Sequence, residues 1–150
     1  MPQLSLQSPV GELTLSEEDG ALVSLDWGRV PEQSESTLLG EARRQLERYF
    51  DGDPAPFELP LAPPGSDFQR RVWARMQAIP AGRTLSYGAL ARELGSAARA
   101  VGAACGANPI PIIVPCHRVI AADGGLGGYS GQGGVETKQA LLRLEGGLPF

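Results

Sequence analysis

The chain has few of the residues that build metal sites and disulfide frameworks: two cysteines and one histidine among 150 residues. A closed zinc site usually takes four Cys or His ligands. Three candidates, two of them adjacent, make a structural zinc untenable, and no dense Asp/His cluster suggests a catalytic metal. We therefore expect no metal and no cofactor, and we expect two free thiols in a reducing compartment.

Long apolar segments are also missing. No apolar run approaches the roughly 20 residues that span a bilayer. The first residues, MPQLSLQSPVGEL, lack the basic start and the apolar stretch of a signal peptide. We therefore expect a cytoplasmic protein without membrane contact. Hydrophobic residues make up 42% of the chain and charged residues 20%, which is typical of a folded globular protein.

The net charge of −4 conceals an uneven distribution. Residues 1–65 contain 4 basic and 12 acidic side chains (4 − 12 = −8), whereas residues 66–150 contain 9 basic and 5 acidic ones (9 − 5 = +4). A basic half is compatible with binding to phosphates while the acidic half faces away.

The first half reads as a small antiparallel sheet with a helix. Residues 12–28 alternate apolar side chains around Asp19-Gly20, a strong hairpin signal. Residues 36–50 place apolar side chains at helical spacing. Residues 51–65 hold five prolines and read as a linker that passes from ordered to flexible. We predict an N-terminal α/β scaffold domain over residues 1–65.

The second half reads as helical. Ser66 and Gln69 form a capping-box pattern before an apolar helix face. Ser86 can cap a second helix that ends at Gly95, and Ser96 can cap a third. Two helices joined by a tight turn predict a helix-turn-helix. The expected fold class is α+β, with a helical, winged-helix-like domain over residues 66–150.

The third helix, SAARAVGAACGAN, is built almost entirely of small residues, with Arg99 as its one long charged side chain. Small residues let a helix backbone approach another surface closely. One interpretation is close packing within the core. The other is approach to a narrow nucleic-acid groove with Arg99 as a probe. Both interpretations stay open at the level of sequence.

The stretch PIIVPCHRVI places Cys116 beside the only histidine, His117. A buried, inert thiol is a common fate for cysteine. However, Cys-His-Arg interrupts a β-branched run that otherwise predicts a buried strand or extended segment, and Pro115 fixes the backbone before the thiol. A neighbouring imidazole or guanidinium lowers the pKa of a thiol and makes the thiolate available. These features favour a catalytic cysteine.

Geometry adds two expectations. Consecutive side chains of a strand point to opposite faces, so the thiol and the imidazole need a sharp turn, a bridging water or both. A histidine base also needs a carboxylate to orient it. Spacing cannot choose among the acidic residues of this half, which are Asp67, Glu93, Asp123, Glu136 and Glu145. Downstream, AADGGLGGYSGQGG places Tyr129 and Ser130 in a glycine-rich loop that suits either a surface loop or the wall of a pocket.

Taken together, IPAGRTLSYGALA, RAVGAACGANP, NPIPIIVPCHRVI, GGYSG and KQALLRLEG resemble the O6-alkylguanine-DNA alkyltransferases. The resemblance runs from about Phe68 to Glu145, and PCHRV is its most specific element. It implies a DNA-repair methyltransferase that flips the damaged nucleotide out of double-stranded DNA from the minor-groove side. It also implies that one alkyl group per molecule moves from O6 of guanine to Cys116, with the protein acting as a monomer.

The resemblance also implies residue roles. Cys116 would be the nucleophile, His117 the water-mediated base, Glu145 the orienting carboxylate and Asn108 the brace of the active-site turns. Tyr87 would contact a phosphate and the flipped base, and Arg99 would fill the vacated stack. The expected substrate-binding residues are Tyr129, Ser130, Gly131 and Val119, the last through its carbonyl together with that of Cys116; the expected DNA-binding residues are Arg99, Tyr87, Gly88 and Ser96.

Two alternatives remain beside this reading. A non-catalytic helix-turn-helix lesion sensor would need no cysteine, and this chain has one. A thiol hydrolase would use Cys116 and His117 but needs an oxyanion hole that the sequence does not reveal. The link GSAAR looks about two residues shorter than in some relatives and the segment before Lys138 about two residues longer, which bears on the adducts accepted.

Overall fold

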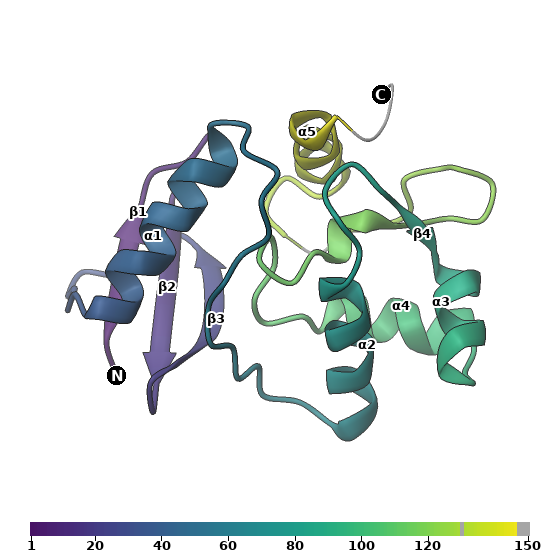
Figure 1. Cartoon of the computed structure of the whole chain (residues 1–150), viewed down its shortest axis with the longest axis horizontal. Coiled ribbons are helices and arrows are strands. Elements are labelled where there is room, and N and C mark those ends of the chain that lie inside the picture. The colour runs from purple at the N-terminus through teal and green to yellow at the C-terminus, as the bar shows by residue number, and fades with distance from the viewer. Residues whose placement is uncertain (130, 147–150) are drawn as a thin grey trace.

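The computed structural model describes residues 1–129 and 131–146 and has a mixed α+β architecture (Figure 1). A three-stranded antiparallel sheet and one helix come first, and within the described residues four further α-helices and a short two-stranded sheet follow. The predicted fold class is confirmed. None of the described helices is both long enough and apolar enough to cross a membrane.

The first sheet consists of β1 (Gln3–Leu6), β2 (Leu13–Glu18) and β3 (Ala21–Trp27), paired in that order. Asp19 and Gly20 form the tip of the β2–β3 hairpin with φ angles of 52° and 78°. Positive φ at both positions is what a two-residue hairpin turn with the correct twist requires. The hairpin prediction is therefore confirmed.

Helix α1 (Thr37–Phe50) lies across one face of this sheet (Figure 1). It begins at Ser36, whose side chain accepts a hydrogen bond from the Leu39 backbone nitrogen at 3.1 Å. Its buried face carries Leu39, Leu46 and Tyr49. Tyr49 occupies the last turn, so the packing of α1 on the sheet fixes where that phenol points.

The middle of the proline-rich segment 51–65 is packed against the sheet. The Leu22 backbone nitrogen donates to the Pro60 carbonyl at 2.9 Å, and the Ala62 nitrogen donates to the Leu22 carbonyl at 2.8 Å. Further along β3, the Leu25 nitrogen donates to the carbonyl of Pro109 in the second half at 2.9 Å. The outer edge of β3 is thus covered, and the two halves of the chain are joined there.

The second half begins with α2 (Asp67–Gln77), where both hydrogen bonds of the predicted Ser66–Gln69 capping box are present. Helices α3 (Tyr87–Leu94) and α4 (Ala98–Gly106) follow and form the helix-turn-helix (Figure 1). Ser86 caps α3, and Gly95 ends it in the left-handed conformation, as predicted.

The prediction that Ser96 caps α4 is wrong. The helix begins after Ala97, which offers no side-chain hydrogen bond. The Ser96 backbone nitrogen instead donates to the Ala91 carbonyl at 2.9 Å, and the Gly95 backbone nitrogen donates to the Arg92 carbonyl at 3.3 Å. These two bonds complete the C-terminal cap of α3, so Ser96 belongs to the preceding helix end.

The β-branched run 110–120 is not a continuous strand. It forms turns, a short 3₁₀ helix η1 (Cys116–Arg118) and the two-residue strand β5 (Val119–Ile120), which pairs with β4 (Leu85–Ser86). Prolines at 109, 111 and 115 have no N–H group to donate to a strand ladder. The final described helix is α5 (Val135–Glu145), which packs against η1.

Candidate active site

Cys116 lies at the start of η1, on a sharply turned segment. The Cys116 nitrogen donates to the Val114 carbonyl at 2.8 Å, and the Arg118 nitrogen donates to Pro115 at 3.0 Å. A sharp turn and a bridging water were the two expected ways to connect the thiol with the imidazole. The structure has the sharp turn. Both side chains are buried, with Cys116 5% exposed and His117 fully enclosed.

The side chain of Asn108 braces this turn with two hydrogen bonds. Its amide nitrogen donates to the Val114 carbonyl at 2.8 Å, and its amide oxygen accepts from the Ile110 nitrogen at 3.0 Å. Between them Ile112 has a φ of 74°, a strained conformation for a β-branched residue. Strain of this kind persists only where the surroundings enforce it, and Asn108 supplies two of the bonds that do so.

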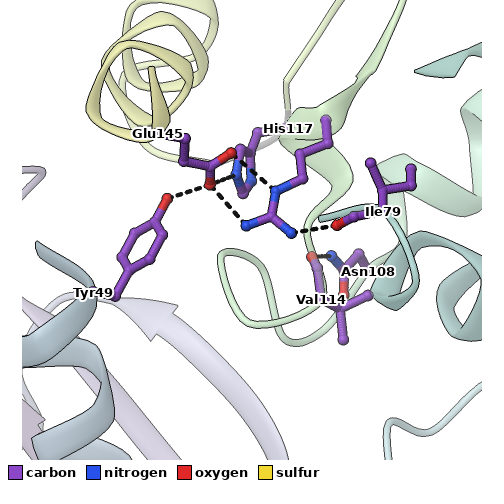
Figure 2. Close-up of polar contacts among 7 residues, drawn as sticks. Tyr49, Ile79, Asn108, Val114, His117 and Glu145 are labelled. Atoms are coloured by element: carbon purple, nitrogen blue, oxygen red, sulfur yellow. Dashed lines mark hydrogen bonds and ion pairs between the residues drawn. The ribbon is translucent and has the colours of Figure 1, made fainter. Parts of the chain in front are cut away.

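The carboxylate of Glu145, at the end of α5, is the centre of a buried hydrogen-bond network (Figure 2). Its Oε2 lies 2.6 Å from His117 Nε2. Arg118 donates to both oxygens, from Nε to Oε1 at 2.9 Å and from Nη2 to Oε2 at 3.0 Å. Arg118 also donates to the Ile79 carbonyl at 2.6 Å. Of the five carboxylates that spacing left open, Glu145 is the one that contacts His117.

The environment sets the protonation of this pair. Burial raises the pKa of Glu145, but the hydrogen bonds from His117 and Arg118 and the positive charge of Arg118 outweigh it and hold the pKa below its usual range. Burial lowers the pKa of His117 and outweighs the hydrogen bond and negative charge of Glu145, which raise it; the positive charges of Arg118 and Lys138 act in the same direction as burial. A neutral imidazole that donates from Nε2 leaves Nδ1 with a free lone pair. Nδ1 is buried and has no hydrogen-bond partner among the described residues, so it can accept a proton.

The thiol is not a ready-made thiolate. Burial raises the pKa of Cys116, and Asn108 and Lys138 offset part of that rise. The expectation that Arg118 or a cationic His117 lowers the thiol pKa is wrong, because Arg118 is bound to Glu145 and His117 is neutral. The cation that lowers it is Lys138, fully buried on α5.

A cavity of about 620 Å³ opens onto Cys116. Tyr87 and Tyr129 stand in its wall, and burial raises the pKa of both phenols, to about 12 for Tyr87. Helix α4 supplies Ala98, Gly102 and Gly106, which lie one turn apart, together with Arg99 and Cys105, and Gly128 completes the lining. The Tyr129 hydroxyl is buried and has no hydrogen-bond partner in the described part of the chain, so it is available to a ligand.

The small residues of helix α4 lie on more than one face of the helix. Val101 and Ala104 are buried in the core, Gly102 lines the cavity, and the buried Cys105 borders both. The helix is therefore closely packed on one face and borders the cavity on another. Arg99 is exposed and forms no hydrogen bond or ion pair with any other described residue, which leaves its guanidinium available.

Other expected site residues lie away from the cavity wall. Gly88 and Ser96 are on α3 and its C-terminal cap. Gly131 lies behind Tyr129, where an added Cβ would come within 2.5 Å of the Tyr129 ring and 2.8 Å of Trp27. The Val119 carbonyl already accepts from Lys138 Nζ at 2.7 Å. Ser130 lies outside the described residues.

Sequence reasoning missed Lys138 and Tyr49. Lys138 donates to the Val119 and Gly128 carbonyls and lies 3.4 Å from the Tyr87 hydroxyl. Its signal was available, because it precedes Leu141, Leu142 and Glu145 on the same helix face. No local signal marks Tyr49, whose hydroxyl donates to Glu145 from 96 residues away.

Comparison with known proteins identifies the family. Residues 67–147 match the model described as "6-O-methylguanine DNA methyltransferase, DNA binding domain", and residues 4–63 match the "ribonuclease-like domain" of the same family. The chain belongs to the 6-O-methylguanine DNA methyltransferase family. The resemblance read from the sequence is confirmed.

Several members of this family align over nearly the whole chain. A methylated-DNA–protein-cysteine methyltransferase of Mycolicibacterium paratuberculosis is 47% identical, over 94% of this chain and 90% of that protein. A constitutive enzyme of the same name from Bacillus subtilis is 40% identical, over 93% of this chain and 92% of that protein. Both relatives carry the name of an enzyme rather than of a regulator.

Solved structures of family members share the fold. The crystal structure of Mycobacterium tuberculosis OGT in complex with DNA superposes with a TM-score of 0.86 at 44% identity, over 97% of this chain and 92% of that one. An O6-methylguanine DNA methyltransferase from Methanococcus jannaschii gives a TM-score of 0.70 at 27% identity, over 98% of this chain and 95% of that one.

Among the described residues, no group of three or more His, Cys, Asp or Glu side chains could hold a metal ion.

Proposed function

We propose that this protein repairs DNA by transferring the methyl group of O6-methylguanine to Cys116, once per protein molecule. The observation that carries the proposal is the cavity, which is lined both by the Cys116 thiol and by the small residues of α4. Family membership supports the same activity. DNA is the partner that the family's DNA-binding domain and the related DNA complex support.

Access to the methyl group requires nucleotide flipping. An atom on a base inside the duplex cannot be attacked in line, and extrusion costs a few kcal/mol. Gly102 allows the duplex to approach α4 closely, and the free Arg99 side chain is long enough to enter the gap that the nucleotide leaves. Approach from the minor groove, where sequence is read poorly, suits a protein that must act in any context.

The chemical step follows from the network around Cys116. The thiol proton passes to His117 Nδ1, through a water if the two atoms are not in contact, and Glu145 stabilises the resulting imidazolium. The thiolate attacks the methyl carbon, the carbon–oxygen bond breaks with its electron pair, and the guanine anion that leaves takes up a proton from solvent to become guanine, while the proton on His117 returns to solvent. Lys138 stabilises the thiolate before the attack. The product is a thioether, which water does not readily cleave, so the site is used once.

Remaining assignments are part of the same proposal. Tyr87 contacts the flipped base and the adjacent phosphate, the Tyr129–Gly131 segment shapes the pocket, and Gly88 and Ser96 approach the DNA backbone. Residues 1–65 form the scaffold domain and residues 66–150 the DNA-binding and acceptor domain. The protein acts as a cytoplasmic monomer.

The test is a mass measurement after incubation with an oligonucleotide that carries one O6-methylguanine. We expect a gain of one methyl group, located on Cys116 by peptide mapping, with unmodified guanine restored in the DNA. Cys116→Ser should bind the DNA and gain nothing, and Cys105→Ser should behave as wild type. Many turnovers per protein molecule, or methylation elsewhere, would contradict the proposal.

A lesion sensor and a thiol hydrolase make different predictions in the same assay. A sensor would retain the lesion-containing DNA without any gain in mass. A hydrolase would show neither binding nor methylation and would turn over activated esters instead. Neither alternative is favoured, because the curated relatives are named as methyltransferases.

A further inference from the structure

Tyr49 reaches from the N-terminal half into the acid–base network of the site. Its hydroxyl donates to Glu145 Oε2 at 2.6 Å. The same oxygen lies 2.6 Å from His117 Nε2 (Figure 2). The phenol and the imidazole therefore compete for the electron density of one carboxylate oxygen.

The arrangement is held rigidly. Tyr49 is 3% exposed, and its ring contacts those of Phe50 and Phe57 at centroid distances of 5.1 and 5.5 Å. The Glu145 side chain is 1% exposed. Oε2 receives contacts from Tyr49, His117 and Arg118, and Oε1 receives one from Arg118, so four contacts hold the carboxylate in place.

We propose that Tyr49 is a positioning residue of the methyl-transfer site, which sets the basicity of His117 through Glu145. The proposal rests on the function proposed above. Tyr49 lies on α1 and is the only described side chain of the N-terminal half that bonds to Glu145. The proposal therefore gives the N-terminal half a part in the chemistry beyond that of a scaffold.

The direction of the effect follows from the hydrogen bond. A phenol that donates to Oε2 withdraws charge from it, so the carboxylate stabilises a proton on His117 less strongly. Burial and the charge of Glu145 raise the pKa of Tyr49, so the phenol keeps its proton across the working range. The other charged or titratable groups that act on His117 are Arg118, Lys138 and the carboxylate itself, and a substitution at Tyr49 leaves all three in place.

The first experiment uses Tyr49→Phe, which removes the hydroxyl and keeps the ring. Because the chain has a single histidine, its imidazole NMR signal can be titrated without assignment ambiguity. We expect the His117 pKa to rise by about half a unit, and the acidic limb of the methyl-transfer rate to move with it, which is roughly threefold in rate at a pH on that limb. A purely structural role would lower stability and leave both values unchanged.

Thr14→Val is the matched control. Thr14 is 3% exposed, and its hydroxyl donates to the Gly28 carbonyl at 2.7 Å within the N-terminal sheet. This variant loses a buried hydroxyl from the same half without touching Glu145. We expect a loss of stability with no change in the His117 titration or in the acidic limb.

A second substitution covers the case in which Tyr49→Phe does not fold. Site-specific 3-fluorotyrosine at position 49 keeps the hydroxyl and makes it a stronger donor, so the His117 pKa should fall. An unchanged His117 pKa in both variants, or a shift of the opposite sign, overturns the proposal. If the wild-type protein itself gains no methyl group, the proposed function fails, and the NMR titration still decides the role of Tyr49.

Discussion

Lys138 is a buried cation whose hydrogen-bond partners among the described residues are all neutral. They are the Val119 and Gly128 carbonyls and the Tyr87 hydroxyl. Burial lowers the pKa of Lys138, whereas the Cys116 and Cys105 thiols raise it. A cation without a carboxylate partner is costly to bury unless it stabilises an anion that forms during the reaction. Ionisation of Cys116 provides that anion, so Lys138 and the thiol act on each other's pKa.

We predict that Lys138→Met raises the Cys116 pKa and slows alkylation by iodoacetamide about tenfold at neutral pH, because the thiolate loses the cation that lowers its pKa. Loss of a cation disfavours the thiolate, so the pH at which the alkylation rate rises should move upward. The measurement is the alkylation rate against pH, with peptide mapping to separate Cys116 from Cys105. As a control, Arg44→Met removes one positive charge from the exposed face of α1 and should leave the pH dependence of the alkylation rate unchanged. If Lys138→Met also leaves that pH dependence unchanged, Lys138 does not stabilise the thiolate.

Helix α4 and the turn before it use glycine for two different reasons. Gly95 ends α3 with a φ of 65°, a conformation that L side chains rarely adopt. Gly102 has no positive φ and no atom within 4 Å of an added Cβ, and it lines the cavity beside Arg99. The first glycine shapes the backbone and the second keeps a surface open.

Alanine at each glycine should separate these roles. Gly95→Ala should lower the free energy of unfolding by about 1 kcal/mol because of its left-handed backbone. Gly102→Ala should keep or raise that free energy by up to about 1 kcal/mol, because alanine is the better helix former. The methyl group that Gly102→Ala adds should also weaken binding to duplex DNA. Urea unfolding and fluorescence anisotropy measure the two effects, and equal DNA affinity for Gly102→Ala and wild type would exclude α4 as the DNA-facing surface.

The two halves of the molecule contact each other at several points. Beyond Tyr49 and Glu145, the Leu25 nitrogen donates to the Pro109 carbonyl, and the Trp27 and Tyr129 rings meet edge to face at 6.4 Å. Residues of the N-terminal half therefore support Tyr129 in the cavity wall and Glu145 in the active-site network. Such coupling favours one cooperative unfolding transition rather than two.

The chain offers one tryptophan reporter in each half, Trp27 and Trp73. In the single-tryptophan variants Trp73→Phe and Trp27→Phe, urea curves from fluorescence should coincide with those from far-UV circular dichroism. Trp73→Phe should also lower the midpoint, because it removes the hydrogen bond from the indole nitrogen to the Ala104 carbonyl at 2.8 Å. Loss of the Trp27 signal at lower urea than the dichroism would show that the halves unfold independently.

What the sequence determined by itself lies within a few residues along the chain. The Asp19-Gly20 turn, the Ser66–Gln69 capping box and the Ser86 cap depend on hydrogen bonds and φ angles that span at most four positions. The Cys116-His117 pair stood out for the same reason. Where a local signal could serve two neighbouring elements, as at Ser96, the backbone bonds of the preceding helix took precedence.

Only the tertiary structure decided which distant groups meet. Spacing left five carboxylates as partners for His117, and the packing of α5 against η1 selects Glu145. The same packing turns Arg118 away from the thiol and brings Lys138 toward it, while α1 delivers Tyr49 from 96 residues away. Charges act through space and respond to burial, so the pKa of each of these groups depends on contacts that the order of residues along the chain does not specify.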